Sequence, residues 1–262
     1  MRGVVTILEI NKIYNMDCLE GMKLLSDECI DLTVTSPPYD DLRNYDGYSF
    51  DFENIAQELY RVTKDGGVVV WIVADATNKG TESGTSFKQA LYFKEIGFNL
   101  WDTMIWNKQG SSGPTPKKRY ENVFEYMFVL SKGIPTHGEL IRDKPNKRAG
   151  QLQCSSVRAK DGSMVKTSGY GKRKIPNFGR RHNIWSILPV KSKKDRIHPA
   201  PFPEQLAGDH ILSWSDEGDI VLDPFIGSGT TAKMAVLYKR NYIGFDISRD
   251  YCDLAEQRLL NL

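Results

Sequence analysis

Apolar residues alternate between short strand-like runs and stretches with helical spacing. The first strand signals are "KIYNMD" (12–17), "IDLTVT" (30–35) and "VVVWIVA" (68–74), and the first helical signals are "LEGMKLLS" (19–26) and "FENIAQELYRVT" (52–63). In the second helical stretch Ile55, Leu59 and Val62 share one face, and Lys64 to Gly67 are expected to end the helix. Strands alternating with helices are typical of a parallel sheet with helical crossovers.

The alternation is interrupted once and then resumes. Two further strands are predicted at 98–108 and 122–131, as the final pair of a sheet. Residues 141 to 196 are rich in Gly, Ser, Lys and Arg and show little sustained periodicity. After them come a helix at 203–214, which Pro203 and Glu204 suit as a first turn, and a strand, helix, strand and helix at 219–225, 229–239, 241–246 and 249–262.

Composition excludes several classes of protein. With 262 residues, 40% hydrophobic and 26% charged, the chain suits one large α/β domain or a domain with an inserted segment. Neither a signal peptide nor an apolar run of about 20 residues is evident, so we expect an unexported protein without a membrane span. The scattered histidines predict no metal site. The cysteines form no C-x-x-C pair, so we expect free thiols at Cys18, Cys29, Cys154 and Cys252.

Charge is distributed unevenly along the chain. The net charge is only +2, which alone predicts no nucleic-acid partner. Residues 141 to 196, however, hold 16 Lys and Arg against 3 Asp and Glu, and the rest of the chain holds 19 against 30. The basic segment therefore suits a surface that contacts phosphates.

The stretch "DLTVTSPPYDD" (31–41) leads a strand directly into two prolines. Each proline holds the residue before it extended and lacks an N–H group, so Ser36 and Pro37 present a hydroxyl and carbonyls in fixed positions. Beside the ring of Tyr39, these groups suit an aromatic guest that donates hydrogen bonds. The alternative is a proline-stiffened surface turn.

A glycine loop follows the strand at 219–225. The pattern Gly227-x-Gly229-x-x-Ala232, with Asp246 placed 19 residues after Gly227, fits a nucleotide-binding fingerprint. An NAD-type dinucleotide is the obvious competitor. Asp223 and Phe225 just before the glycines argue against it, and only 16 residues follow Asp246, so the remaining strands must lie upstream. We therefore expect a permuted sheet.

Three motifs carry a family resemblance. The motifs are "TSPPY" (35–39), "HPAPFPEQL" (198–206) and "DPFIGSGTT" (223–231), and the chain has the order proline turn, basic region, glycine loop. Together they resemble the permuted, beta-group DNA amino-methyltransferases of the N4-cytosine/N6-adenine type, which use S-adenosylmethionine. The resemblance implies an α/β, permuted Rossmann-like methyltransferase fold with a mostly parallel seven-stranded sheet. Its expected parts are a catalytic half (1–140), a basic target-recognition region (141–196) and a cofactor-binding half (197–262).

The resemblance also implies a cofactor site for S-adenosyl-L-methionine. Phe225 would face the sulfonium as a cation–π partner, and Asp246 would hold the ribose hydroxyls. Asp17 would accept from the adenine amino group, with a helix N-cap as its alternative role. The residues implied to bind the cofactor are Asp17, Thr35, His198, Phe202, Asp223, Pro224, Phe225, Gly227, Ser228, Gly229, Thr230 and Asp246.

The implied catalytic residues are Ser36, Pro37, Pro38 and Tyr39. In this interpretation Tyr39 stacks on a base flipped out of duplex DNA, while the Ser36 hydroxyl and the Pro37 carbonyl accept from its exocyclic amine. Ser36 favours cytosine N4, with adenine N6 as the alternative. The family completes its base pocket at positions that correspond to Trp106, Lys108, Tyr120 and Asn122, with a core position as the alternative for Trp106. The base-reading residues of the basic segment carry no motif.

Double-stranded DNA is the expected partner, in the cytoplasm of a prokaryotic or phage-infected cell. The resemblance leaves open a cognate restriction endonuclease and a homodimer. A nucleotide-dependent oxidoreductase and a catalytically silent DNA-binding protein are the rival functions.

Overall fold

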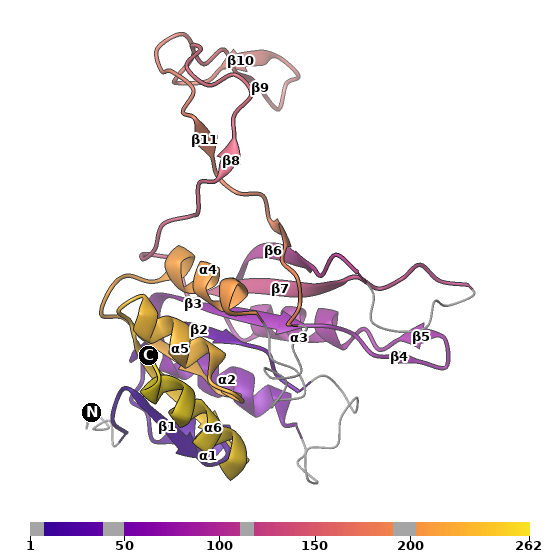
Figure 1. The fold of residues 1–262 in the computed structure, drawn as a ribbon. Helices are drawn as coiled ribbons and strands as arrows, with labels where there is room; N and C mark the ends of the chain where they lie inside the picture. Colours follow the sequence, from indigo (N-terminus) through magenta and orange to yellow (C-terminus); the bar gives the residue numbers. More distant parts are fainter. Residues whose placement is uncertain (1–7, 39–49, 111–117, 191–202) are drawn as a thin grey trace. The chain divides into compact units, whose positions relative to one another are not determined.

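A computed structural model describes residues 8–38, 50–110, 118–190 and 203–262 (Figure 1). The chain divides into two compact units, Met1–Glu139 with Asn183–Leu262 and, separately, Leu140–His182. The basic segment expected at 141–196 is thus divided, because its part from Asn183 onward belongs to the first unit.

The first unit contains an eight-stranded sheet in the order β1-β14-β13-β2-β3-β7-β6-β12. Among these described strands only β7 runs antiparallel to the others. The strands are β1 (Lys12–Asn15), β2 (Ile30–Thr35), β3 (Thr63–Val73), β6 (Asn99–Asn107), β7 (Phe124–Ser131), β12 (Ile184–Ser186), β13 (Ile220–Asp223) and β14 (Asn241–Asp246). A small hairpin, β4 (Thr77–Asn78) with β5 (Thr81–Glu82), follows β3.

Helices cover both faces of the sheet (Figure 1). On one face they pack around Trp71 and Phe93, and on the other around Ile211 and Ala235. The first group is α1 (Cys18–Lys23), α2 (Phe52–Val62) and α3 (Thr85–Glu95), and the second is α4 (Glu204–Trp214), α5 (Thr230–Leu237) and α6 (Arg249–Leu260). None of the described helices is both long and apolar enough to span a membrane.

All seven predicted strands are present, and the sheet contains one strand more than predicted. The additional strand is β12, three residues within the basic segment that pair in parallel with the end of β6. Its position is held by a hydrogen bond from Trp106 Nε1 to the carbonyl of Ile187 (2.8 Å) and by stacking of Trp185 on His210. So short a strand among lysines and arginines has no alternation by which to recognise it.

The helix ends at Val62, as expected, but Lys64 to Gly67 already belong to β3, which begins at Thr63 and not at the predicted Val68. Gly66 stays in the strand at a φ of +78° and donates its N–H to the carbonyl of Lys132, so two glycines form an irregular stretch of strand. Helix α3 was not predicted. It is amphipathic only in part: Phe93 is buried and Gln89 accepts from Trp71 Nε1 (2.9 Å), but Leu91 is exposed.

The second unit is an antiparallel arm. Its strands are β8 (Lys144–Pro145), β9 (Ser156–Arg158), β10 (Met164–Lys166) and β11 (Phe178–Gly179), with β8 pairing β11 and β9 pairing β10. Backbone hydrogen bonds such as Gln153 to Arg173 and Thr167 to Ser155 continue the ladder between them. All residues of this unit are described and only Gly169 is buried, so the arm has no hydrophobic core of its own.

Candidate active site

The candidate site lies at the carboxyl ends of two neighbouring strands, β2 and β13. The chain leaves β2 through α2 to reach β3 on one side, and leaves β13 through α5 to reach β14 on the other. Ligands of open α/β sheets bind at such a switch point, where the crossovers diverge. The proline turn from Ser36 and the "DPF" turn from Asp223 begin there side by side.

Asp223 holds the two strand ends together. Its Oδ1 accepts from Thr35 Oγ1 (2.7 Å) and from the N–H of Phe225 (3.1 Å), and its Oδ2 accepts from Thr231 Oγ1 (2.7 Å). The Thr231 hydroxyl also lies 3.2 Å from the carbonyl of Val34. Burial raises the pKa of Asp223 to about 6, although the three hydrogen bonds favour its charged form.

The glycine loop turns back on itself above α5. Gly227 and Gly229 have φ values of +49° and +79°, which residues with a Cβ atom rarely adopt. Asp246, at the end of β14, accepts from the N–H of Gly227 (3.0 Å) and of Ser248 (2.8 Å), one on each carboxylate oxygen. Burial raises the pKa of Asp246 as well. Each oxygen keeps a second lone pair that can accept from a ligand hydroxyl.

Ser228 and Thr230 are engaged by Arg258 of α6. One guanidinium nitrogen donates to the carbonyl (2.8 Å) and the hydroxyl (3.1 Å) of Ser228 and lies 3.4 Å from Thr230 Oγ1. The other donates to Glu204 (2.8 Å), which also accepts from Lys233 (2.6 Å). The glycine loop is thereby fixed to the first turn of α4 and to the last turns of α6.

A pocket opens beside these turns and contains about 550 Å³ of space free of protein atoms, including its mouth. It brings together six of the described residues predicted for the site, Asp17, Ser36, Pro38, Pro224, Phe225 and Asp246, together with Met16, Cys18, Ile247 and Tyr251. Phe225 is held by edge contacts with Phe50 and Trp71, at centroid distances of 5.8 and 6.5 Å. The pocket combines apolar walls with carboxylates, as sites for small ligands do.

Other predicted residues support the pocket or lie elsewhere. Pro37, Thr35 and Asp223 are buried next to the lining residues. The loop residues Gly227, Ser228, Gly229 and Thr230 do not line the pocket. Tyr39, His198 and Phe202 lie outside the described residues.

The unpredicted lining residues include two with a sequence signal. Met16 precedes Asp17 after β1, and Ile247 follows Asp246 after β14. Because β1 and β14 are parallel partners, these apolar residues reach the same edge of the sheet as the two acids. An apolar residue next to each acid at the end of a strand could therefore have predicted that Met16 and Ile247 line the pocket. Cys18 and Tyr251, both in the first turn of a helix, offered none.

Asp17 has the structural role that was its alternative interpretation, and it also lines the pocket. Its Oδ1 accepts from the N–H groups of Leu19 (2.8 Å) and Glu20 (3.2 Å), which caps the N-terminus of α1. The two roles are compatible, because a carboxylate has further lone pairs.

The four residues expected to complete the base pocket do not lie together in the pocket. Trp106 is a core residue, 4% exposed, and Lys108 pairs with Glu125 (2.7 Å). Tyr120 and Asn122 line a different hollow, together with Asp75 and other residues.

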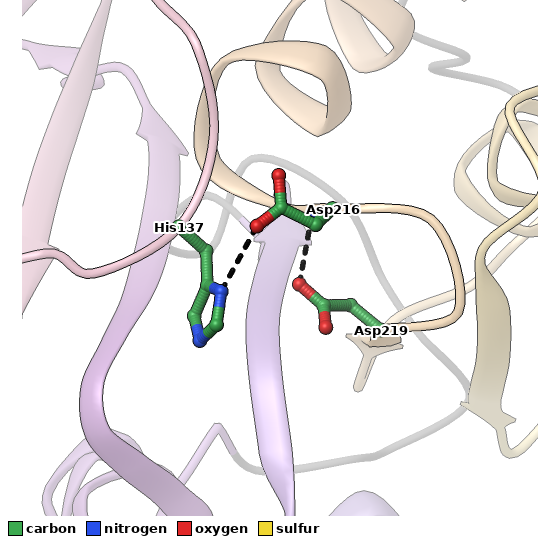
Figure 2. Close-up of side chains that lie close together, drawn as sticks. All are labelled: His137, Asp216 and Asp219. Carbon is green, nitrogen blue, oxygen red and sulfur yellow. Dashed lines mark hydrogen bonds and ion pairs between the residues drawn. The ribbon is translucent and has the colours of Figure 1, made fainter.

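A polar cluster lies beside the amino end of β13, whereas the pocket lies beyond the carboxyl end of that strand (Figure 2). Nδ1 of His137 lies 3.0 Å from Asp216 Oδ2, and the N–H of Asp216 donates to Asp219 (2.8 Å). Ligand atoms of these three side chains lie within 4.8 Å of one another. They close the turn between α4 and β13, and His137 and Asp216 are exposed. No spacing pattern indicates this grouping, since His137 is far from the two acids along the chain.

Comparison with known proteins places this geometry in a family. The family model described as DNA methylase, of the N6/N4 type, matches residues 30–257. The orphan methyltransferase M.BamHII of Bacillus amyloliquefaciens is 59% identical over 244 residues, covering 90% of this chain and 91% of that protein.

Solved structures share the fold. The PvuII DNA methyltransferase, described as cytosine-N4-specific, has a TM-score of 0.68 at 21% identity, covering 95% of this chain and 86% of that one. M1.HpyAVI in complex with S-adenosylmethionine has a TM-score of 0.63 at 21% identity, covering 95% and 99%. These matches confirm the predicted methyltransferase fold with its mostly parallel sheet.

The family match confirms S-adenosylmethionine as the methyl donor, whereas the beta-group assignment stays a prediction. The chain belongs to the N6/N4 family of S-adenosylmethionine-dependent DNA methylases.

Proposed function

We propose that the enzyme transfers a methyl group from S-adenosylmethionine to N4 of cytosine in duplex DNA. One observation supports this most: the proline turn, through Ser36 and Pro38, and the cofactor-type residues Phe225 and Asp246 line one pocket. Both halves of a methyl transfer can therefore meet in it.

The pocket fits the adenosyl part of the cofactor. Asp246 has lone pairs left for ribose hydroxyls, and Asp17 can accept from an adenine amino group. Met16 and Ile247 supply apolar surface for the adenine ring, and Phe225 supplies an aromatic face for a sulfonium, worth about 0.5 to 2 kcal/mol. When bound, the cofactor supplies an electrophilic methyl group.

The proline turn would orient the other reactant. The Ser36 hydroxyl and the Pro37 carbonyl would accept from an exocyclic amine and favour a tetrahedral nitrogen. Flipping the base costs a few kcal/mol, which Tyr39 would offset by stacking. An amide-like amine is a weak nucleophile. Most of the rate enhancement would therefore come from holding the nitrogen about 3 to 3.5 Å from the methyl carbon and in line with the sulfur. The mechanism requires no covalent nucleophile.

The basic arm would provide the DNA-contacting surface. Residues 140–182 hold twelve lysines and arginines against two aspartates. We place target recognition in this unit, and the activity in the cytoplasm of a prokaryotic or phage-infected cell. Action beside a cognate endonuclease and homodimer formation stay predictions.

The product identifies the target base. We expect N4-methylcytosine when DNA methylated by the purified enzyme is digested to nucleosides and separated by mass and retention. N6-methyladenine would overturn the assignment of cytosine and keep the amino-group mechanism, because Ser36 accepts from either amine. A 5-methylcytosine product would defeat the mechanism, since ring-carbon methylation needs a different site.

Replacing Ser36 or Tyr39 by alanine should slow methyl transfer far more than it weakens the affinity for S-adenosylmethionine measured by calorimetry. Stacking alone is worth roughly 1 to 3 kcal/mol per base, so Tyr39→Ala should lower kcat/KM for DNA by about 5- to 150-fold. Ser186→Ala, an exposed serine of β12 that does not line the pocket, is the matched control. Loss of thermal stability with unchanged specific activity would show that the turn serves the fold only.

A further inference from the structure

The far end of the arm is a hairpin with two uncovered faces. All six residues of β9 and β10 are exposed, including Val157 at 55%, Met164 at 66% and Val165 at 50%. A two-stranded ribbon is at best marginally stable in water when nothing packs on it. Its shape must therefore come from its turn and ladder, and its faces are available to a partner.

The turn that joins the two strands is well defined. Ala159 donates its N–H to Ser163 (2.8 Å), Gly162 donates to Ala159 (2.9 Å), and Gly162 has a φ of +88°. Asp161 accepts from the N–H and the hydroxyl of Ser163, at 2.9 and 2.7 Å. A turn followed by a glycine of positive φ is a standard three-residue hairpin connection. These hydrogen bonds define the turn, and the turn sets the register of the two strands.

The register sorts the side chains into two faces. Met164 pairs with Arg158, Val165 with Val157, and Lys166 with Ser156. Paired residues share a face and neighbours alternate, so one face carries Ser156, Arg158, Met164 and Lys166, and the other carries the two valines. The first face combines hydrogen-bonding groups with one apolar side chain.

We propose that β9 and β10 enter the major groove of DNA as a two-stranded ribbon, and that Arg158 reads a base there. The inference rests on the proposed DNA-methylating function. The major groove is wide enough for a two-stranded ribbon, and an arginine pairs with guanine O6 and N7 through two hydrogen bonds. Arg158 immediately precedes the turn, on the polar face. Its Nε donates to the carbonyl of Gly162 (3.3 Å), so its two terminal nitrogens are the groups that would meet the base.

Charge identifies the partner as nucleic acid. The unit carries six basic residues for each acidic one, and the ribbon itself contains Lys166 in β10 and Lys160 in its turn. Such an excess of positive charge attracts the phosphate backbone. Contacts to phosphates alone do not depend on the sequence and need no base-reading side chains, whereas the polar face of the ribbon carries side chains that can hydrogen-bond to bases. Met164, beside Arg158, can contact a thymine methyl group.

Arg158→Lys tests the proposal because it keeps the charge and loses the paired geometry. The recognition sequence of the wild-type enzyme is first determined by sequencing modified bases in plasmid DNA. We expect Arg158→Lys to reduce the preference for the cognate site over a site altered at one base pair by roughly 5- to 150-fold. The salt dependence of DNA binding and the affinity for S-adenosylmethionine should stay unchanged, because neither the net charge nor the pocket is altered.

Lys147→Ala is the matched control, since it removes a charge from an exposed position of the same arm away from the ribbon. It should weaken binding to all sequences alike and lower the salt slope by about 0.9 for each phosphate that is no longer neutralised. Unchanged site preference in Arg158→Lys, or an equal relaxation in Lys147→Ala, would overturn the proposal. A change in sedimentation mass without a change in preference would assign the ribbon to contact with a second copy of the chain, and also overturn it.

The two proposals fail separately. The identity of the methylated base tests the proposed function, while the sequence around that base tests the ribbon. A wild-type product of N6-methyladenine with a relaxed site in Arg158→Lys would support the ribbon and reject cytosine.

Discussion

Asp223→Asn should stabilise the protein by about 3 kcal/mol at pH 8. Burial raises the pKa of this carboxyl from its ordinary value of 3.8 to about 6, and each pKa unit corresponds to about 1.4 kcal/mol. Asparagine can keep the local bonds: its Oδ1 accepts from Thr35 and Phe225, and its amide donates to Thr231, whose own hydrogen turns toward Val34. The variant thus removes a buried charge at little cost in hydrogen bonds.

The gain should depend on pH in a defined direction. An acid whose pKa is raised in the folded state contributes most stability below its unfolded pKa, and this contribution is lost as the pH rises through the folded pKa. The difference between variant and wild type should therefore be near zero at pH 4, grow up to about pH 6 and then stay constant. Urea denaturation across this range measures it. A gain independent of pH would contradict the assignment to Asp223 ionisation.

Asp31→Asn is the matched control. Asp31 is also buried, but it pairs with Lys64 (2.6 Å) and accepts from the N–H of Ile220 (2.9 Å). Its replacement should destabilise the protein. For Asp223→Asn we also expect weaker S-adenosylmethionine binding in calorimetry, because the resemblance implies that Asp223 lies at the methionine end of the cofactor. Stability would then rise as function falls, a common exchange at active sites.

Gly229→Ala should lower the free energy of unfolding by about 2 to 5 kcal/mol. A left-handed backbone costs an alanine roughly 1 to 2 kcal/mol. Its Cβ would also lie 2.7 Å from the Cβ of Ala255 and 3.1 Å from its Cα, and overpacking typically adds about 1 to 3 kcal/mol. Thermal unfolding measures the sum.

Gly218→Ala separates the two contributions. Gly218 has a φ of +92° but no described atom within 4 Å of an added Cβ, so only the backbone cost applies. Ala255→Gly in the Gly229→Ala background removes the contact between the two Cβ atoms. It should restore part of the lost free energy of unfolding, even though a glycine within α6 itself costs about 1 kcal/mol. Equal destabilisation by the two glycine substitutions would show that the close contact between the glycine loop and α6 is unimportant.

Much of the sheet was predictable because its signals are local. The strands β2 and β14 match the predicted bounds, since both are short apolar runs between turn residues. The failures have a common cause, which is tertiary context. Strand β12 is held by Trp106 and His210, and β3 continues through glycines because its neighbours supply hydrogen-bond partners there.

The site was predictable only where parallel strands end. Because these ends share one edge of the sheet, Asp17, Ser36 and Asp246 meet as expected. The bond between Thr35 and Asp223, 188 residues apart, and the contact of Arg258 with Ser228 depend on how helices and strands pack. Neither pair has a pattern of spacing that predicts it.

The arm has a consequence for how such an enzyme can diversify. One buried residue among residues 140–182 means that substitutions there remove almost no buried apolar surface. Changes in a core are filtered by a stability threshold, since most of them cost free energy of unfolding. Changes on the arm escape this filter. Its sequence can therefore change while the larger unit stays folded. If the arm carries target recognition, as we propose, a new target specificity need not be accompanied by compensating mutations elsewhere.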